Sequence, residues 1–203
     1  MAGQAQTQSW IGPEEYLAIE RRATHRSEYL GGNMFAMAGA NRQHNRISSN
    51  LVSGIDQHIK SRDCNVYAND MRVYVPSTGY FTYPDVVITC GHEEFLDTYN
   101  DILVNSLVII EILSDSTAVY DRGKKFEQYR ELASFVEYLL VEQRTPRVEQ
   151  YIRHESEEWL YRDIRGIDDQ MVTIHTIECP LPLRDIYHKV NISSRLIHLR
   201  PAS

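Results

Sequence analysis

The sequence has few cysteines and no stretch that suggests a membrane or secretory protein. Its 203 residues include only Cys64, Cys90 and Cys179, which lie far apart and form no Cys-x-x-Cys pair. Such a sparse, odd set argues against a disulfide framework and against a structural zinc site, so we expect free, buried thiols. No apolar run is long enough to cross a bilayer, and the first residues lack the basic start and apolar stretch of a signal peptide. We therefore expect a cytoplasmic protein without membrane association.

Several catalytic motifs are also missing. The sequence contains no Gly-x-Gly-x-x-Gly, no phosphate-binding glycine-lysine loop and no Gly-x-Ser-x-Gly. The stretch His92-Glu93-Glu94 lacks the helical His-x-x-x-His spacing of a zinc site and falls in an expected loop. These absences leave no dinucleotide site, nucleoside-triphosphate loop or serine nucleophile to build on.

Basic residues are also fewer than acidic ones. Lysine and arginine total 21 against 28 aspartates and glutamates, a net charge of −7. Nucleic-acid-binding proteins normally present a basic face, so this balance counts against a broad DNA-binding surface. A group of carboxylates around a metal ion would account for part of the excess. The hydrophobic content of 42% is typical of a globular protein, and the length fits one domain over residues 1–203, with loose ends at 1–10 and 199–203.

Hydrophobic periodicity predicts a mixed sheet with helices packed on it, in the α/β or α+β class. Helices are expected at residues 13–20, 41–60 and 121–132, and Gly31-Gly32 predicts a hairpin between two short strands. The most hydrophobic run, 107–113, predicts a central strand buried on both faces. The order strand, helix, strand over 107–141 predicts a parallel pair. Further strands are expected at 66–68, 71–75 and 85–88, and those at 148–153, 159–162 and 171–176 should extend the sheet as a meander.

Two acids occupy positions that need an explanation. Glu111 interrupts the apolar run 107–113, where a charge costs several kcal/mol unless it is paired or bound to a cation. Asp85 follows Pro84 at the head of the apolar run 86–88. Without a metal, Glu111 would form a buried salt bridge to an arginine, and Asp85 would be a simple turn aspartate. Together, two carboxylates on adjacent strands favour a hard cation such as Mg²⁺, which activates water and stabilises charge on a phosphodiester.

The helix that follows offers a positive charge for such a site. Lys125 and Tyr129 are four residues apart and share a helix face, so an inward-facing Tyr129 would draw Lys125 toward the sheet. The alternative is an ordinary lysine whose stem lies along the helix and whose ammonium is in water.

These residues carry a resemblance to a known family. The stretches YPDVVI (83–88), LVIIEILSDST (107–117), YDRGKKFEQY (120–129) and EYLLV (137–141) resemble the putative restriction endonuclease family of the PD-(D/E)XK nuclease superfamily. The resemblance covers most of the chain and implies a restriction-endonuclease-like mixed sheet flanked by helices, with Mg²⁺, or Mn²⁺ as a substitute, in the site. It matches Asp85 and Glu111 to the two motif acids. The superfamily pattern has lysine two residues after the second acid, where this sequence has Leu113, and Lys125 matches the lysine that stands in for it.

Three further positions are candidates, and the resemblance extends to the first two of them, Glu28 and His44. Glu28 is similar to an acid ahead of the sheet and is a third candidate metal ligand; an exposed strand glutamate is the alternative. His44 resembles a frequent family histidine that could touch phosphate or cap its helix, and we favour a structural role. Asp70 could be a further ligand, although a turn aspartate fits its position better.

The function expected from the sequence is a Mg²⁺-dependent DNA endonuclease that acts as a homodimer. Asp85, Glu111 and Glu28 would hold the metal, and Lys125 would orient water or stabilise charge on the phosphate. One alternative is a catalytically inactive DNA-binding or scaffolding module on the same fold, which the net charge and Leu113 favour. A glycosidase with paired carboxylates is another, which Lys125 argues against because it adjoins the acids.

Overall fold

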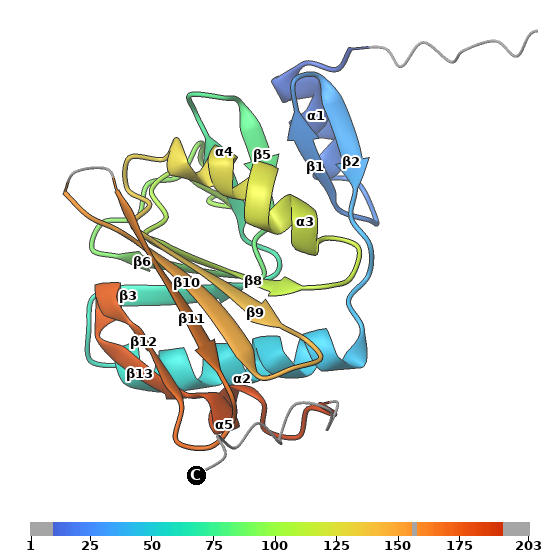
Figure 1. Ribbon diagram of the computed structural model, residues 1–203. Coiled ribbons are helices and arrows are strands. Elements are labelled where there is room, and N and C mark those ends of the chain that lie inside the picture. The colour runs from blue at the N-terminus through green and yellow to red at the C-terminus, as the bar shows by residue number, and fades with distance from the viewer. Residues whose placement is uncertain (1–9, 156–157, 193–203) are drawn as a thin grey trace, which may run out of the picture.

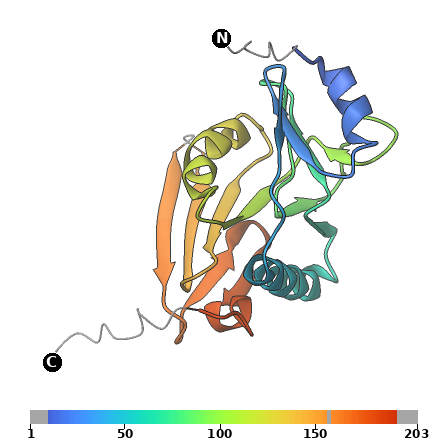
Figure 2. The same ribbon diagram turned by 90° about the vertical axis from the view of Figure 1, so that its right-hand side faces the viewer.

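A computed structural model describes residues 10–155 and 158–192. The ends expected to be loose, 1–10 and 199–203, lie outside the described residues apart from Trp10. Within the described ranges, no helix is long and apolar enough to cross a membrane. Figures 1 and 2 show a central sheet between a long helix on one side and a shorter helical segment on the other.

In the described part of the chain, the main sheet has six strands in the order β11-β10-β9-β8-β6-β3. Strands β8 and β9 are parallel and the other pairs are antiparallel, as the strand-helix-strand order predicted for β8 and β9. β8 is buried along its whole length, because its apolar residues face helices or loops on both sides. The strands are β3 (Cys64–Ala68), β6 (Val86–Cys90), β8 (Val108–Leu113), β9 (Glu137–Glu142), β10 (Arg147–Arg153) and β11 (Trp159–Arg165).

A second sheet, in the order β2-β1-β5-β4-β7, stands beside the first (Figure 1). It contains the predicted hairpin, and α1 (Pro13–Glu20) packs on it through Tyr16. The 71–75 stretch belongs to this sheet as β4, so the strands do not all join one sheet as the sequence suggested. The strands are β1 (Ser27–Leu30), β2 (Asn33–Ala36), β4 (Arg72–Val75), β5 (Tyr80–Thr82) and β7 (Ile102–Leu103).

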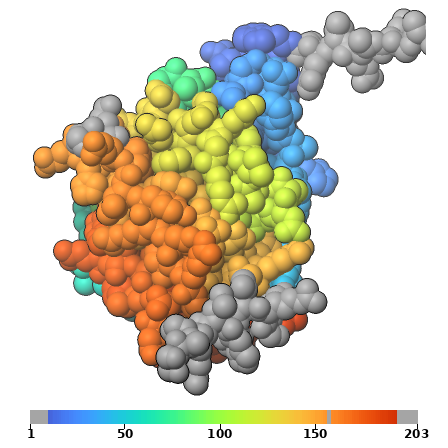
Figure 3. Space-filling view, in the orientation of Figure 1, coloured from blue at the N-terminus to red at the C-terminus, as the bar shows by residue number. Residues whose placement is uncertain are grey.

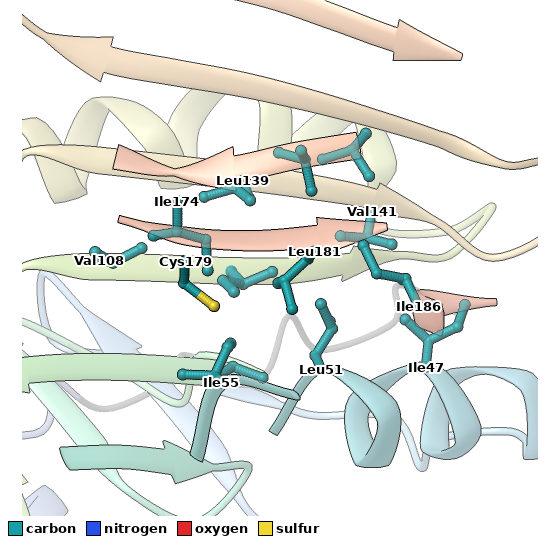
Figure 4. Close-up of a cluster of buried hydrophobic side chains, with 14 of the residues drawn as sticks. Ile47, Leu51, Ile55, Val108, Leu139, Val141, Ile174, Cys179, Leu181 and Ile186 are labelled. Carbon is teal, nitrogen blue, oxygen red and sulfur yellow. The ribbon is translucent and has the colours of Figure 1, made fainter. Parts of the chain in front are cut away.

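The long helix α2 (Arg42–Ile59) covers one face of the main sheet, as its periodicity predicted. Its apolar stripe of Ile47, Leu51, Ile55 and Ile59 is buried, with none of the four side chains more than 2% exposed. Figure 4 shows Ile47, Leu51 and Ile55 pointing from the helix toward Leu181 and the strands above it.

The prediction that residues 171–176 extend the main sheet is wrong. β12 (Met171–Ile174) pairs with β13 (Cys179–Pro182) in a separate two-stranded sheet, linked by a 3₁₀ turn (His175–Ile177) and followed by α5 (Leu183–Ile186). The alternating residues Val172 and Ile174 bury against the face that carries α2. The apolar side of this hairpin therefore covers the sheet and does not lengthen it.

The expectation of free cysteines is wrong for two of the three. Cys64 on β3 and Cys90 on β6 lie directly opposite each other in the antiparallel register and form a disulfide. Cys179 is free and buried, as expected.

The other face of the main sheet carries a helical segment that the sequence placed at 121–132. The segment begins earlier, with α3 (Ala118–Tyr120), continues through a π-helical turn (Asp121–Lys125) and ends in α4 (Phe126–Arg130). Aromatic side chains, Phe126 and Tyr129 among them, pack it onto the sheet.

Candidate active site

The two unusual acids of the sequence meet at the end of the paired strands β6 and β8. Val86 of β6 lies opposite Ile110 of β8, so the same antiparallel register, extended by one residue, puts Asp85 beside Glu111. Residues opposite each other in an antiparallel pair project from the same face. Asp85 Oδ2 also accepts a hydrogen bond of 2.7 Å from the backbone N–H of Ile112. The backbone pairing therefore fixes both carboxylates at one place.

Lys125 reaches the same place from the π-helical turn. Its side chain is buried, and its Nζ lies 2.9 Å from Glu111 Oε1, 3.1 Å from Glu28 Oε1 and 3.9 Å from Asp121 Oδ1. The neighbouring Lys124 is exposed. π-helical turns are rare in proteins, and many of those that occur lie at functional sites. Here Asp121 and Lys125, at the two ends of the turn, are both buried.

Burial and charge act against each other in this cluster. Burial opposes the charge of the Lys125 ammonium, but Glu111, Tyr129 and Glu28 together hold its pKa well above the usual value. Burial raises the pKa of Glu111 to about 8, although Lys125 pulls it down. Burial likewise raises the pKa of Asp121 against the pull of the same lysine. The single positive charge of Lys125 thus balances only part of the negative charge that these carboxylates carry when ionised. A bound cation would balance more of it.

Hydroxyl groups hold the acids in place. Tyr129 donates a hydrogen bond of 2.7 Å to Glu111 Oε1. Thr82 donates one of 2.6 Å to Glu28 Oε1, and Tyr80 donates one of 3.0 Å to Glu28 Oε2. Every donor is buried, so each bond is protected from competition with water. Glu28 is accordingly not the exposed strand glutamate that the sequence left open.

His44 lies against Asp85. The side chain of Asn41 caps α2 by accepting a 2.9 Å hydrogen bond from the His44 backbone N–H, so the cap comes from Asn41 and not from the His44 ring. The ring Nε2 lies 3.0 Å from Asp85 Oδ1. Its Nδ1 is buried and has no hydrogen-bond partner among the described residues. The histidine thus supports Asp85 from the start of the helix.

The acids of the site, together with Lys125 and His44, line a cleft of about 810 Å³. Its walls are the β1–β2 hairpin with the loop that follows it, the start of α2, and the segment of α3 and the π turn. In the space-filling view of Figure 3, the hairpin (blue) lies beside that segment (yellow-green). Asp70 also lines the cleft, but its side chain is exposed and forms its ion pair with Arg26. The side-chain carboxylates of the lining are Glu28, Asp70, Asp85, Glu111 and Asp121.

The donor groups suit a hydrated hard cation. Mg²⁺ is usually held by one or two carboxylates and keeps several waters, which corresponds to Asp85 and Glu111 at the cleft wall. Within residues 10–155 and 158–192, no three or more histidines, cysteines, aspartates or glutamates converge as they would in a closed protein cage. The set therefore fits a Mg²⁺ or Mn²⁺ site better than a zinc site.

Sequence reasoning missed three contributors to this cluster. Asp121 precedes Lys125 by four residues, and that spacing could have marked it as a partner of the lysine. Thr82 and Tyr80 lie on β5 in the second sheet, and no local pattern relates them to Glu28.

Comparisons with known proteins identify a matching family and similar chains. Residues 13–177 match the model of the Uma2 family, whose description is "Putative restriction endonuclease". Two proteins of Synechocystis sp. (strain ATCC 27184 / PCC 6803 / Kazusa) are similar. One, "Uncharacterized protein sll1609", is 34% identical over 152 residues, which cover 75% of this chain and 86% of the relative. The other, "Uncharacterized protein slr1290", is 31% identical over 158 residues, covering 78% and 82%.

A solved structure shares the fold. The crystal structure of a putative nuclease belonging to DUF820 from Anabaena variabilis ATCC 29413 superposes with a TM-score of 0.71. The match covers 87% of this chain and 97% of the other, at 18% sequence identity. It confirms the predicted mixed α and β fold with sheets flanked by helices.

Proposed function

Because the chain belongs to the Uma2 family of putative restriction endonucleases, we propose that it is a Mg²⁺-dependent endonuclease that hydrolyses phosphodiester bonds of DNA. The observation that carries this proposal is the meeting of Asp85, Glu111 and Lys125 at one cleft wall, with Lys125 Nζ 2.9 Å from Glu111 Oε1. Two carboxylates and a lysine ammonium are the groups that metal-assisted phosphoryl chemistry requires.

In this mechanism, Asp85 and Glu111 would hold the metal, which would supply the positive charge that activates a water and offsets charge on the phosphate. Ile112 N–H and His44 orient Asp85, and Tyr129 orients Glu111. Lys125 donates hydrogen bonds to the attacking water or to a phosphate oxygen. Lys125 would act from the helical segment. The strand position at which the superfamily has lysine is Leu113 here, which is apolar and buried.

Glu28 stays a predicted metal ligand, but its contacts support a different role. Thr82, Tyr80 and Lys125 already occupy its two oxygens. A metal bound at Oε1 would displace Thr82 or Lys125, because both already contact that oxygen. We therefore propose that Glu28 positions Lys125 through their 3.1 Å ion pair.

The test is a cleavage assay on plasmid and branched DNA with and without Mg²⁺ or Mn²⁺, using Asp85→Asn. Asparagine keeps an oxygen that can accept from the Ile112 N–H, so the fold should survive while the charge that binds the metal is lost. We expect cleavage to fall by at least ~100-fold, the scale of losing one catalytic electrostatic group, and Mn²⁺ affinity measured by calorimetry to fall with it.

Asp70→Asn is the matched control, because Asp70 lines the same cleft but is exposed and paired with Arg26. Its cleavage and metal binding should resemble those of the wild type. Full activity in Asp85→Asn would remove Asp85 from the mechanism. DNA binding without cleavage in the wild type would favour the inactive binding module instead. A homodimer and a cytoplasmic location stay predictions from the sequence.

A further inference from the structure

One exposed aromatic side chain lies inside the cleft. Phe35 on β2 is 53% exposed and is the only exposed large apolar side chain of the described residues that also lines the cleft. The packing of the hairpin explains why it is free. Tyr29 and Met34 project from the other face of the hairpin and pack against α1 and β5, so the hairpin is held without Phe35.

The strand register puts this ring next to the catalytic cluster. Phe35 pairs directly with Glu28 across the hairpin, so the two side chains project from the same face with their Cβ atoms about 5 Å apart. Glu28 in turn is 3.1 Å from the ammonium of Lys125. A group bound on the Phe35 ring would therefore be an immediate neighbour of a phosphate that Lys125 contacts.

The chain that follows β2 adds little bulk to the cleft. Residues 38–40, with the sequence Ala-Gly-Ala, line the cleft just after β2. At Gly39, no atom lies within 4 Å of the point where a Cβ would stand. Residues 38–40 therefore add no side chain larger than a methyl group to the lining of the cleft.

Charge makes a continuous duplex a poor occupant. The arginine and lysine side chains that line the cleft in the described part of the chain are Arg26 and Lys125, and both are ion-paired to carboxylates. Duplex DNA brings one negative charge per about 1.7 Å of axis and is held mainly by cations. An unpaired base, by contrast, can gain affinity by stacking on an aromatic ring, without any cation.

We propose that Phe35 stacks on an unpaired nucleobase next to the scissile phosphate, so that the preferred substrate is single-stranded DNA or the single-stranded arm of a branched junction. The proposal rests on the endonuclease function above. Phe35 is then a substrate-binding residue that selects unpaired over fully paired DNA.

The first experiment compares Phe35→Ala, Phe35→Trp and wild type on a single-stranded oligonucleotide, a flap junction and a blunt duplex. Stacking on an aromatic side chain is worth ~1–3 kcal/mol per base, so Phe35→Ala should raise KM for the first two substrates by about 5- to 150-fold. Phe35→Trp should stay near wild type, and the duplex should be unaffected. Met171→Ala is the matched control, since Met171 is also 53% exposed but lies away from the cleft on β12.

The second experiment measures stacking without catalysis. An oligonucleotide carrying 2-aminopurine should lose fluorescence on binding to the wild type, Phe35→Trp and Met171→Ala, but not on binding to Phe35→Ala. Equal quenching by Phe35→Ala, or an equal loss of cleavage on all three substrates, would overturn the stacking role. A wild type that cleaves none of the substrates would overturn the endonuclease function, while the quenching result would still decide the role of Phe35.

Discussion

Replacing Lys125 by methionine tests the buried charge cluster most directly. The substitution keeps most of the apolar stem and removes the ammonium, which leaves Glu28, Glu111 and Asp121 without their shared cation. At an effective dielectric constant of about 20, the attractions at 2.9 and 3.1 Å are each worth about 5–6 kcal/mol before desolvation is counted. Removing one partner of a buried pair typically costs about 3–5 kcal/mol net, which we expect here for the free energy of unfolding at pH 8.

The cost should depend on pH. Without the attraction of Lys125, the raised pKa values of Glu111 and Asp121 rise further. The folded variant then binds more protons than the unfolded chain at pH values between the ordinary carboxyl pKa and these raised values. The free energy of unfolding then falls as pH rises through that window. The penalty of Lys125→Met, relative to wild type, should therefore be smaller at pH 5 than at pH 8.

Urea denaturation at the two pH values, followed by circular dichroism, measures both effects. Lys124→Met is the control, because Lys124 is exposed and its loss should change stability by less than about 0.5 kcal/mol. A penalty below about 1 kcal/mol for Lys125→Met at both pH values would refute the buried ion pairs. Cleavage activity that survives in this variant would remove the lysine from the mechanism.

Two further predictions concern Glu111 and the disulfide. Burial raises the pKa of Glu111 to about 8, so the metal-free protein should lose roughly 1 kcal/mol of unfolding free energy per pH unit as pH rises from about 5 to 8. Glu111→Gln should reduce this pH dependence in urea titrations. An unchanged pH dependence would assign the effect to other groups. Cys64→Ser opens a disulfide whose cysteines are 26 residues apart, which should cost about 3 kcal/mol; thiol titration of the unreduced, denatured wild type should find only Cys179, and three thiols there would contradict the pairing.

The acids of the site could be predicted from the sequence because each breaks a strong local pattern. A charge within the apolar run of β8 requires a partner or a cation, which singled out Glu111. Lys125 was within reach of local reasoning too, because its spacing from the buried Tyr129 places both on one helix face.

The remaining features depend on contacts between distant segments. The role of Glu28 depends on its contacts with Lys125 and with Thr82 of β5, which neither hairpin strand encodes. The same holds for Cys64 and Cys90, whose spacing gives no signal until β3 and β6 are paired. The alternation in β12 fits an added edge strand as well as a separate hairpin, so only the packing of Val172 and Ile174 distinguishes them.

The acidic balance of the chain bears on how the proposed substrate would be held. The net charge of −7 and the carboxylates that line the cleft would repel a phosphate backbone from a metal-free site, and the lining side chains of Arg26 and Lys125 are already paired. A divalent cation held by Asp85 and Glu111 would supply the missing positive charge at the phosphate itself. A base stacked on Phe35 would add affinity that needs no charge. Under the two proposals, the metal and one aromatic ring replace the broad basic face of other DNA-binding proteins, so the acidic composition favours local recognition of a short, unpaired segment.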